Sequence, residues 1–254
     1  MIVAAKKRRP AHLSLAQRLG VAIVTGRYPP GSILPGEIEF AESVGVSRSV
    51  FREALRTLAA KGLVVSRPKT GTRVRERQDW NLLDPELLGW MFEGAPSLPF
   101  VRSLFQLRMI VEPAAAELAA VGRSARQLSE MGHALELMAH HGLASEVGRA
   151  ADHQFHALIL QATDNELLVS LSASIAAAVR WTTFFKYRHE EHPRDPMPEH
   201  RALFETIANG DAAGAREATR ALVNQAQLDT EAAIQFDERR GRSSAAAGDQ
   251  QPPL

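Results

Sequence analysis

Hydrophobic and polar positions follow two different patterns along this chain and divide it into two parts. Up to Arg77, short stretches with helical spacing are followed by a brief alternation of apolar and polar residues, which is typical of a small hairpin. From Val101 to Phe236, nearly every segment repeats apolar residues at helical spacing, and no alternation typical of strands occurs. The pattern predicts a mostly helical protein in two parts, the second being an antiparallel helical bundle.

Three helices are predicted in the first part. The first starts near Ser14, a plausible N-cap, and stops before Gly26, and the second runs from about 37 to 44. Ser47 can cap the third helix, and Gly62 ends it. The third helix has an apolar inner face and a polar, basic outer face.

A basic hairpin is predicted directly after the third helix. Two short strands, 63–66 and 72–75, enclose the tip Arg67-Pro68-Lys69-Thr70-Gly71. Three helices followed by such a hairpin form a winged helix-turn-helix.

Changes in composition suggest where the parts begin and end. The predicted segments are a basic flexible N-terminus at 1–11, the winged helix-turn-helix at 12–77, a linker with a docking helix at 78–98, a helical domain at 99–238 and a disordered tail at 239–254. Breaks between the helices of the bundle are expected near Gly122, Gly142, Asp164, 193–198 and Gly210.

Charge is distributed unequally between the two parts. The net charge of the chain is +1, but the residues up to Arg77 include 15 Lys and Arg against 5 Asp and Glu. The remaining residues include 15 Lys and Arg against 24 Asp and Glu. Positive charge concentrated in a small module is expected where the partner is a polyanion.

Composition excludes several classes of protein. The chain has no cysteine, which excludes a disulfide scaffold, a cysteine nucleophile and a thiolate metal site. Hydrophobic residues make up 45% and charged residues 23%, as in a globular protein with a core. No apolar run is long enough for a membrane span, and the basic start MIVAAKKRRPAH is not a secretory signal. A cytoplasmic protein without membrane contact is expected.

The polar face of the third helix is a candidate DNA-reading surface, because arginine can pair bidentately with guanine in the major groove. The expected DNA contacts are Ser47, Arg48, Ser49, Arg52 and Arg56 from the helix, and Lys69, Thr70 and Gly71 from the wing. Arg67, Arg73 and Arg75 would add phosphate contacts. A role of the same module in protein contacts is the alternative, which the positive charge disfavours.

Three polar residues lie where helical spacing places the core of the second part. Asp152 and His156 are four residues apart on one apolar stripe, and His200 lies on another. A buried carboxylate beside imidazoles must be neutralised, and a divalent metal ion would do so. Hydrogen bonding within the core is an equally good reading of the spacing.

Residues 34–74, LPGEIEFAESVGVSRSVFREALRTLAAKGLVVSRPKTGTRV, resemble the DNA-binding domain of the GntR superfamily. The matching positions are Leu34-Pro35, Glu37, Ala41, Gly45-Val46-Ser47-Arg48, Arg52-Glu53-Ala54-Leu55, Leu58, Gly62-Leu63 and Gly71-Thr72. The sequence departs from the pattern at Ile38, where the family usually has an arginine that touches DNA. The resemblance implies a homodimeric transcription regulator that binds a palindromic operator in double-stranded DNA.

Three further stretches, 108–120, 152–156 with Asn165, and 199–204, resemble the FadR C-terminal effector domain of the FadR subfamily. Many members of that subfamily bind a metal through one Asp and three His, and the matching residues here are Asp152, His156 and His200, with zinc as the expected ion. The position of the third His is occupied by Leu222. Water or an effector could complete the coordination of a three-ligand site, and a metal-free pocket is the alternative.

Candidate effector contacts come from two arginines and two amides. Arg108 could clamp a carboxylate or pair with Glu112 four residues along its helix. Arg180 could bind a carboxylate or hydroxyl, or pack on the core with its charged end at the surface. The linker QDWNLLDPELLGWMFE is similar to that of sugar-acid regulators, which implies an aldonate effector such as galactonate, with hydroxyls near Asn224 and Gln225.

The resemblance implies a repressor of a sugar-acid catabolic operon that leaves its operator when effector binds to the helical domain. A regulator responding to another organic acid or to a fatty acyl thioester is one alternative. A metal-dependent enzyme acting on nucleic acid is the other, and it is disfavoured because no general base is evident near the three candidate ligands. We therefore expect no enzymatic activity.

Overall fold

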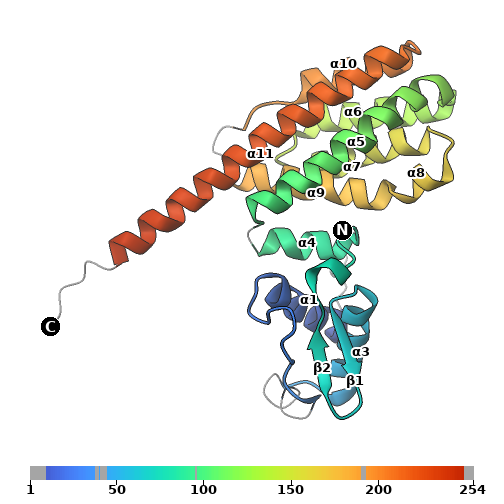
Figure 1. The fold of residues 1–254 in the computed structure, drawn as a ribbon. Helices are drawn as coiled ribbons and strands as arrows, with labels where there is room; N and C mark the ends of the chain where they lie inside the picture. Colours follow the sequence, from blue (N-terminus) through green and yellow to red (C-terminus); the bar gives the residue numbers. More distant parts are fainter. Residues whose placement is uncertain (1–9, 38–39, 41–44, 95, 190–192, 249–254) are drawn as a thin grey trace, which may run out of the picture. The chain divides into compact units, whose positions relative to one another are not determined.

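The computed structural model of the chain describes residues 10–37, 40, 45–94, 96–189 and 193–248, with side chains as far as Phe236 except at His189 (Figure 1). The chain folds into two compact units, divided after Ala95. The predicted class is confirmed, because the described residues form helices and one two-stranded antiparallel sheet.

Within the described residues, the first unit contains four helical elements and the sheet. In order they are α1 (Ala11–Val24), α3 (Arg48–Ala60), β1 (Val64–Arg67), β2 (Gly71–Val74), the 3-10 helix η1 (Arg77–Asp79) and α4 (Pro85–Glu93). The prediction that the first helix starts at Ser14 was wrong: α1 begins after Pro10, whose carbonyl accepts from the backbone N–H groups of Leu13 and Ser14. The predicted helix at 37–44, including Ile38, lies almost wholly outside the described residues.

Helix α3 is bounded as its sequence predicts. Ser47 Oγ accepts from the backbone N–H of Val50 at 3.3 Å, which satisfies one of the free donors at the helix start. Gly62 follows the helix with φ +75, and a Cβ there would lie 2.4 Å from the carbonyl oxygen of Asp79. Phe51, Ala54 and Leu58 are buried, so the apolar face of α3 is part of the core.

The wing is a tight antiparallel hairpin in which Val64 pairs with Val74 and Arg67 with Gly71. Lys69 has φ 66 and follows Pro68, and the backbone N–H of Thr70 donates to the carbonyl of Arg67 at 3.3 Å. This turn matches type II, whose third position requires a positive φ. The strands lie within one residue of their predicted positions.

Helix α4, from the segment expected to link the domains, packs within the first unit. Asp84 caps it by accepting from the backbone N–H groups of Glu86 and Leu87 at 3.0 and 2.9 Å. The ring of Trp90 lies so close to α1 that a Cβ at Gly20 would be 2.2 Å from it. Lys61, just after α3, is buried and pairs with Asp84 at 2.7 Å and with Glu86 at 2.8 Å.

The second unit is a helical bundle, and no strand occurs in the part of it that the structure describes. Its helices are α5 (Leu98–Gly122), α6 (Ala125–His141), α7 (Glu146–Gln161), α8 (Glu166–Ser170), α9 (Ser172–His189), α10 (Met197–Ala208) and α11 (Ala212–Gly248). The breaks fall where glycine, Asp164 and the proline-rich stretch predict them. Helices α5 and α11 lie side by side and antiparallel (Figure 1), joined by the ion pairs Arg102–Glu231 and Arg216–Glu117.

The C-terminal segment differs from its prediction over part of its length. Helix α11 continues to Gly248 and so includes residues 239–248, for which the sequence predicts disorder. The segment RRGRSSAAAG is rich in Ala and Arg, which are strong helix formers, and it extends an existing helix, so that no new nucleus is needed. Residues 249–254 lie outside the described residues.

Candidate DNA-binding surface and candidate metal centre

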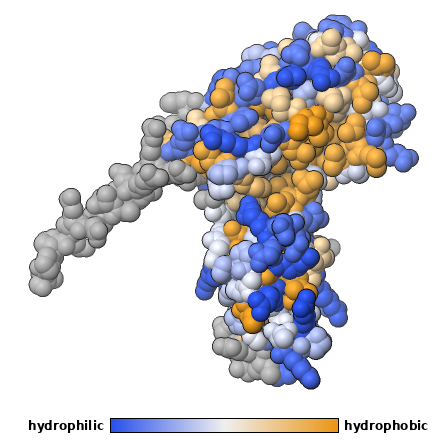
Figure 2. Space-filling model, in the orientation of Figure 1, coloured by the Kyte–Doolittle hydropathy of each residue, from blue (hydrophilic) through white to orange (hydrophobic). Residues whose placement is uncertain are grey.

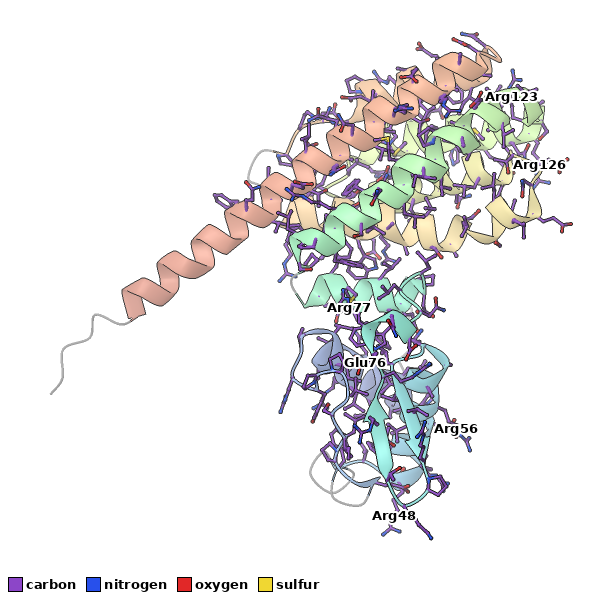
Figure 3. The ribbon with its side chains drawn as sticks, in the orientation of Figure 1. Arg48, Arg56, Glu76, Arg77, Arg123 and Arg126 are labelled. Carbon is purple, nitrogen blue, oxygen red and sulfur yellow. The ribbon has the colours of Figure 1, made fainter. Side chains whose placement is uncertain are left out.

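The outer face of α3 carries the predicted DNA contacts at the surface. Arg48, Ser49, Arg52 and Arg56 are all exposed, and Figure 3 shows Arg48 and Arg56 pointing away from the first unit. Arg56 pairs with Glu53 at 2.6 Å, and Arg52 lies 4.0 Å from Glu37. Pairs this exposed contribute little, so a phosphate or a guanine edge can displace them.

The wing presents a second basic surface. Lys69 and Thr70 are exposed, and Gly71 at the tip has φ +79, so its backbone can approach a phosphate closely. Two of the arginines expected to contact phosphate have partners within the unit. Arg73 donates to the carbonyl of Gly31, and Arg75 lies 3.5 Å from Asp79.

The three predicted metal ligands come together in the core of the second unit. Asp152 and His156 lie on α7 and His200 on α10, and all three are buried. One ligand atom from each lies within 4.8 Å of the others. His200 Nε2 is 3.1 Å and His156 Nε2 is 3.8 Å from Asp152 Oδ1.

The outward nitrogen of each imidazole has an acceptor of its own. His200 Nδ1 lies 2.8 Å from the carbonyl oxygen of Pro196, and His156 Nδ1 lies 2.7 Å from Glu112 Oε2. A carbonyl or a carboxylate can only accept, so both Nδ1 atoms carry hydrogen. In the neutral rings both Nε2 lone pairs therefore point towards Asp152. Second partners of this kind orient histidine ligands in metal sites.

The charges of Asp152, His200 and Glu112 show that the cluster favours a bound cation. Burial raises the pKa of Asp152, but hydrogen bonding and charge from His200, with His156 and Thr183, outweigh it and hold the pKa below its usual range. Burial lowers the pKa of His200, but Asp152 outweighs it and raises the pKa above the usual value. Burial likewise raises the pKa of Glu112, yet Arg108 and His156 lower it to about 2. An ionised Asp152 facing two imidazole nitrogens thus attracts either a proton or a metal cation.

A small inner cavity of about 40 Å³ adjoins the cluster. Besides the three candidate ligands, it is lined by Arg108, Thr182, Thr183, Lys186, Asp229 and Leu222, among others. Sites for drug-sized ligands usually measure roughly 300 to 1,000 Å³. The inner cavity can therefore hold an ion with a few further atoms, and a larger ligand requires it to open.

Arg108 forms the ion pair with Glu112 that the spacing of the sequence allows, while its predicted contact with an effector carboxylate stays a prediction. Its Nε donates to Glu112 at 2.6 Å, with both side chains buried, and its Nη1 donates to Thr182 Oγ1 at 3.4 Å. The guanidinium also lines the inner cavity, where it can meet an anion. Leu222 lines the same cavity, so an apolar side chain faces the candidate ligands from α11.

Three proposed effector contacts are not brought to this cavity. Arg180 is exposed on α9 and lines a different pocket. Asn224 is exposed, and Gln225 donates from Nε2 to Asp229 Oδ1 at 2.9 Å instead of facing the cavity. None of the three lines the inner cavity, so their role as effector contacts stays a prediction.

Sequence reasoning did not identify four polar residues that lie near the cluster: Glu112, Thr183, Lys186 and Asp229. Thr183 Oγ1 donates to Asp152 Oδ2 at 3.0 Å, and Lys186 Nζ donates to Asp229 Oδ2 at 2.7 Å. Glu112, considered only as a partner of Arg108, also contacts His156. Glu112 could have been found, because it lies on the inward stripe of its helix, but the other pairs join distant segments.

No helix among the described residues is long and apolar enough to span a membrane.

Comparison with known proteins gives the family. Residues 12–74 match the family described as bacterial regulatory proteins, gntR family, and residues 103–225 match the FCD domain. The chain is 32% identical to the galactonate operon transcriptional repressor of Escherichia coli, over 81% of this chain and 90% of that protein. It is 36% identical to the uncharacterized HTH-type transcriptional regulator YieP of the same organism, over 82% and 90%.

A solved structure shares the fold. It belongs to Lar, described as controlling the expression of the Listeria monocytogenes agr system, and it aligns over 89% of this chain and 99% of that chain, with 19% identity and a TM-score of 0.63. This likeness supports the fold alone. With a basic winged helix-turn-helix in one unit and an FCD domain in the other, the chain belongs to the gntR family of ligand-responsive, DNA-binding transcriptional regulators.

Proposed function

We propose that this regulator is a cytoplasmic homodimeric repressor that binds a divalent metal ion and a sugar acid in its FCD domain and then leaves its operator. The observation that carries the proposal is the convergence of two histidine Nε2 atoms and an ionised carboxylate on one buried point. Similarity to the galactonate operon repressor supports an aldonate such as galactonate as the effector.

The residues present fit a metal ion. Asp152, His156 and His200 would hold it, and zinc suits a site of two nitrogens and one oxygen. When bound, the ion supplies positive charge and open coordination positions for a carboxylate and a neighbouring hydroxyl. Glu112 and the carbonyl of Pro196 hold the imidazoles with Nε2 facing inward.

The charges around the inner cavity favour an anionic effector. Arg108 presents a guanidinium beside the candidate ligands, while Lys186 and Arg194 stand at the same cavity, paired with Asp229. A carboxylate near the metal would be balanced by the ion and by Arg108. Thr182, Thr183 and Thr230 offer hydroxyls as partners for hydroxyl groups of the ligand.

An exposed apolar face supports the dimer. Ile110, Leu118 and Val121 of α5 are 67%, 45% and 73% exposed, and Figure 2 shows hydrophobic residues gathered on the face of the second unit that includes α5. Contiguous apolar surface of this kind usually marks an interface. A second copy placed there would pair two winged helices, as a palindromic operator requires.

A smaller acid is the second candidate effector. An inner cavity of about 40 Å³ accommodates a short hydroxy acid with less opening than a six-carbon aldonate. Both candidates chelate through a carboxylate and an adjacent hydroxyl, so they differ only in length.

The test begins with DNA selected by the protein from a random duplex pool. We expect galactonate with zinc to weaken binding to this DNA at least tenfold in fluorescence anisotropy, and galactonate to raise the melting temperature by a few degrees. Arg48→Ala should abolish specific binding, and Asp152→Ala should retain DNA binding but lose the response. Arg126→Ala, on the exposed surface of α6, is the matched control.

Three outcomes would contradict the proposal. Full operator affinity in Arg48→Ala would remove α3 as the reading helix. An undiminished ligand response in metal-free protein would remove the metal. A response to a short hydroxy acid and none to galactonate would replace the aldonate with the second candidate.

A further inference from the structure

A second pocket lies on the outside of the second unit, between α7 and α9. We call it the outer pocket; its volume is about 320 Å³, and it is lined by Glu146, Arg149, His153, Arg180, Trp181 and Phe184, with Ala150. This volume falls at the lower end of the usual range for small-molecule sites, roughly 300 to 1,000 Å³. It shares no lining residue with the inner cavity.

Two arginines of the outer pocket lack anionic partners among the described residues. Arg180 is exposed and makes no ion pair there. Arg149 donates from Nη1 to the carbonyl oxygens of Leu143 and Ala144, and it has no carboxylate partner in the described part of the chain. Two positive charges thus face one pocket, while the single carboxylate of the lining, Glu146, pairs with neither.

Aromatic rings hold both guanidinium groups in place. Arg149 lies over the ring of Phe184 at 5.4 Å from its centroid, and Arg180 lies over Trp181 at 5.8 Å. The two rings meet edge to face, with centroids 5.7 Å apart. A guanidinium stacked on a ring can still donate from its edge, and less side-chain entropy is lost when it pairs with a ligand. In Arg149 only Nη1 donates to the two carbonyls, which leaves Nε and Nη2 for a ligand.

We propose that the outer pocket is a second ligand site, which binds a small organic dicarboxylate between Arg149 and Arg180. The planar fork of each guanidinium matches a carboxylate, and two separate arginines favour a ligand with two carboxylates over one with a single charge. The site is independent of the metal and of the aldonate of the inner cavity. A ligand there contacts the outer sides of α7 and α9, the two helices that carry Asp152 and Thr183 on their inner sides.

The test uses succinate as the probe and the full chain, stripped of metal and dialysed, in isothermal titration calorimetry. We expect one saturable site per chain with a Kd of about 1 mM or tighter, which two ion pairs can supply for a small ligand. Arg180→Ala and Arg149→Ala should each weaken binding about tenfold or more. Asp152→Ala should leave succinate binding unchanged, because its side chain lies in the other cavity.

Two further variants separate binding from folding and from general charge. Glu146→Gln removes the one carboxylate of the pocket and should tighten succinate binding about threefold or more, a gain that a folding defect cannot produce. Arg188→Ala removes an equal charge from an exposed position of α9 outside the pocket and should leave the Kd unchanged. The proposal is overturned if wild type shows no saturable binding up to about 10 mM, or if Arg180→Ala and Arg188→Ala bind succinate equally.

Discussion

A single buried carboxylate, that of Glu112, contacts both Arg108 and the candidate metal ligand His156. Glu112 binds Arg108 through Oε1 and contacts His156 Nδ1 through Oε2. Loss of such a partner typically costs ten- to hundredfold in metal affinity, because the imidazole loses orientation and basicity. We predict that Glu112→Gln lowers zinc affinity by about this factor, measured by competition with a chromophoric chelator.

Two variants make this prediction decisive. Glu112→Asp keeps the charge but shortens the side chain, and we expect an intermediate loss of zinc affinity. Glu117→Gln lies on the same helix with its partner Arg216 at the surface, so its zinc affinity should equal that of wild type. Unchanged affinity in folded Glu112→Gln would show that the carboxylate serves only Arg108.

Asp229 should contribute to stability in a pH-dependent way. Burial raises its pKa, but Lys186, Gln225 and Arg194 outweigh burial and lower the pKa below its usual value. Its contribution is therefore complete above the unfolded pKa of about 3.9 and is lost as the pH falls through the lower folded pKa. We predict that Asp229→Asn unfolds more readily near neutral pH and shows a flatter acid limb in denaturant titrations. Asp164→Asn, in an exposed turn, should follow the wild-type curve.

Sequence reasoning found the cluster of Asp152, His156 and His200 but not its surroundings, for reasons of geometry. Asp152 and His156 share a stripe at i and i+4, so local spacing alone places both inward. Arg180 was a candidate effector contact, but Thr182 and Thr183 line the inner cavity and Arg180 does not, because each step along a helix turns a side chain by about 100°. The partner of Lys186 lies 43 residues away on another helix, and no local pattern predicts that pairing.

At the scale of elements, the segment expected to link the two units contains a helix, α4, that packs tightly within the first unit. Turn residues and prolines predict a short docking helix, and the structure shows α4 attached to α1 and α3 through Trp90 and Lys61. Burial lowers the pKa of Lys61, but Asp84 and Glu86 outweigh it and raise the pKa above its usual value. The ammonium therefore stays charged and holds the start of α4.

Removing this ammonium should release α4 while leaving the winged helix folded. We predict that Lys61→Met lowers the stability of the first unit by about 1 to 3 kcal/mol, since two carboxylates lose a partly buried partner. Hydrogen exchange at the backbone amides of 85–93 should quicken most. Lys69→Met, on the exposed wing, is the control and should change neither measurement. Equal protection of α4 in both variants would assign its docking to Trp90 alone.

For the whole molecule, the unequal distribution of charge determines which unit binds DNA. Thermodynamic coupling between the two binding sites determines how the other unit controls that binding. The basic residues up to Arg77 provide the DNA affinity, so that affinity should fall steeply with salt. The acidic remainder would repel DNA, so in the proposed dimer its influence would pass through the populations of dimer arrangements.

Linkage makes this control reciprocal and therefore measurable from either side. If effector weakens operator binding a hundredfold, the coupling is about 2.7 kcal/mol, and saturating operator must weaken effector binding by the same factor. We predict that the Kd of galactonate, measured by calorimetry with zinc present, rises about a hundredfold when the selected duplex is added, and not when a scrambled duplex is added. In Arg48→Ala the same duplex should leave the galactonate Kd unchanged, because the reading helix no longer engages the operator. A galactonate Kd that ignores operator in the wild-type protein would mean that ligand and DNA bind without communication, and the repressor mechanism would then fail even if both ligands bind tightly.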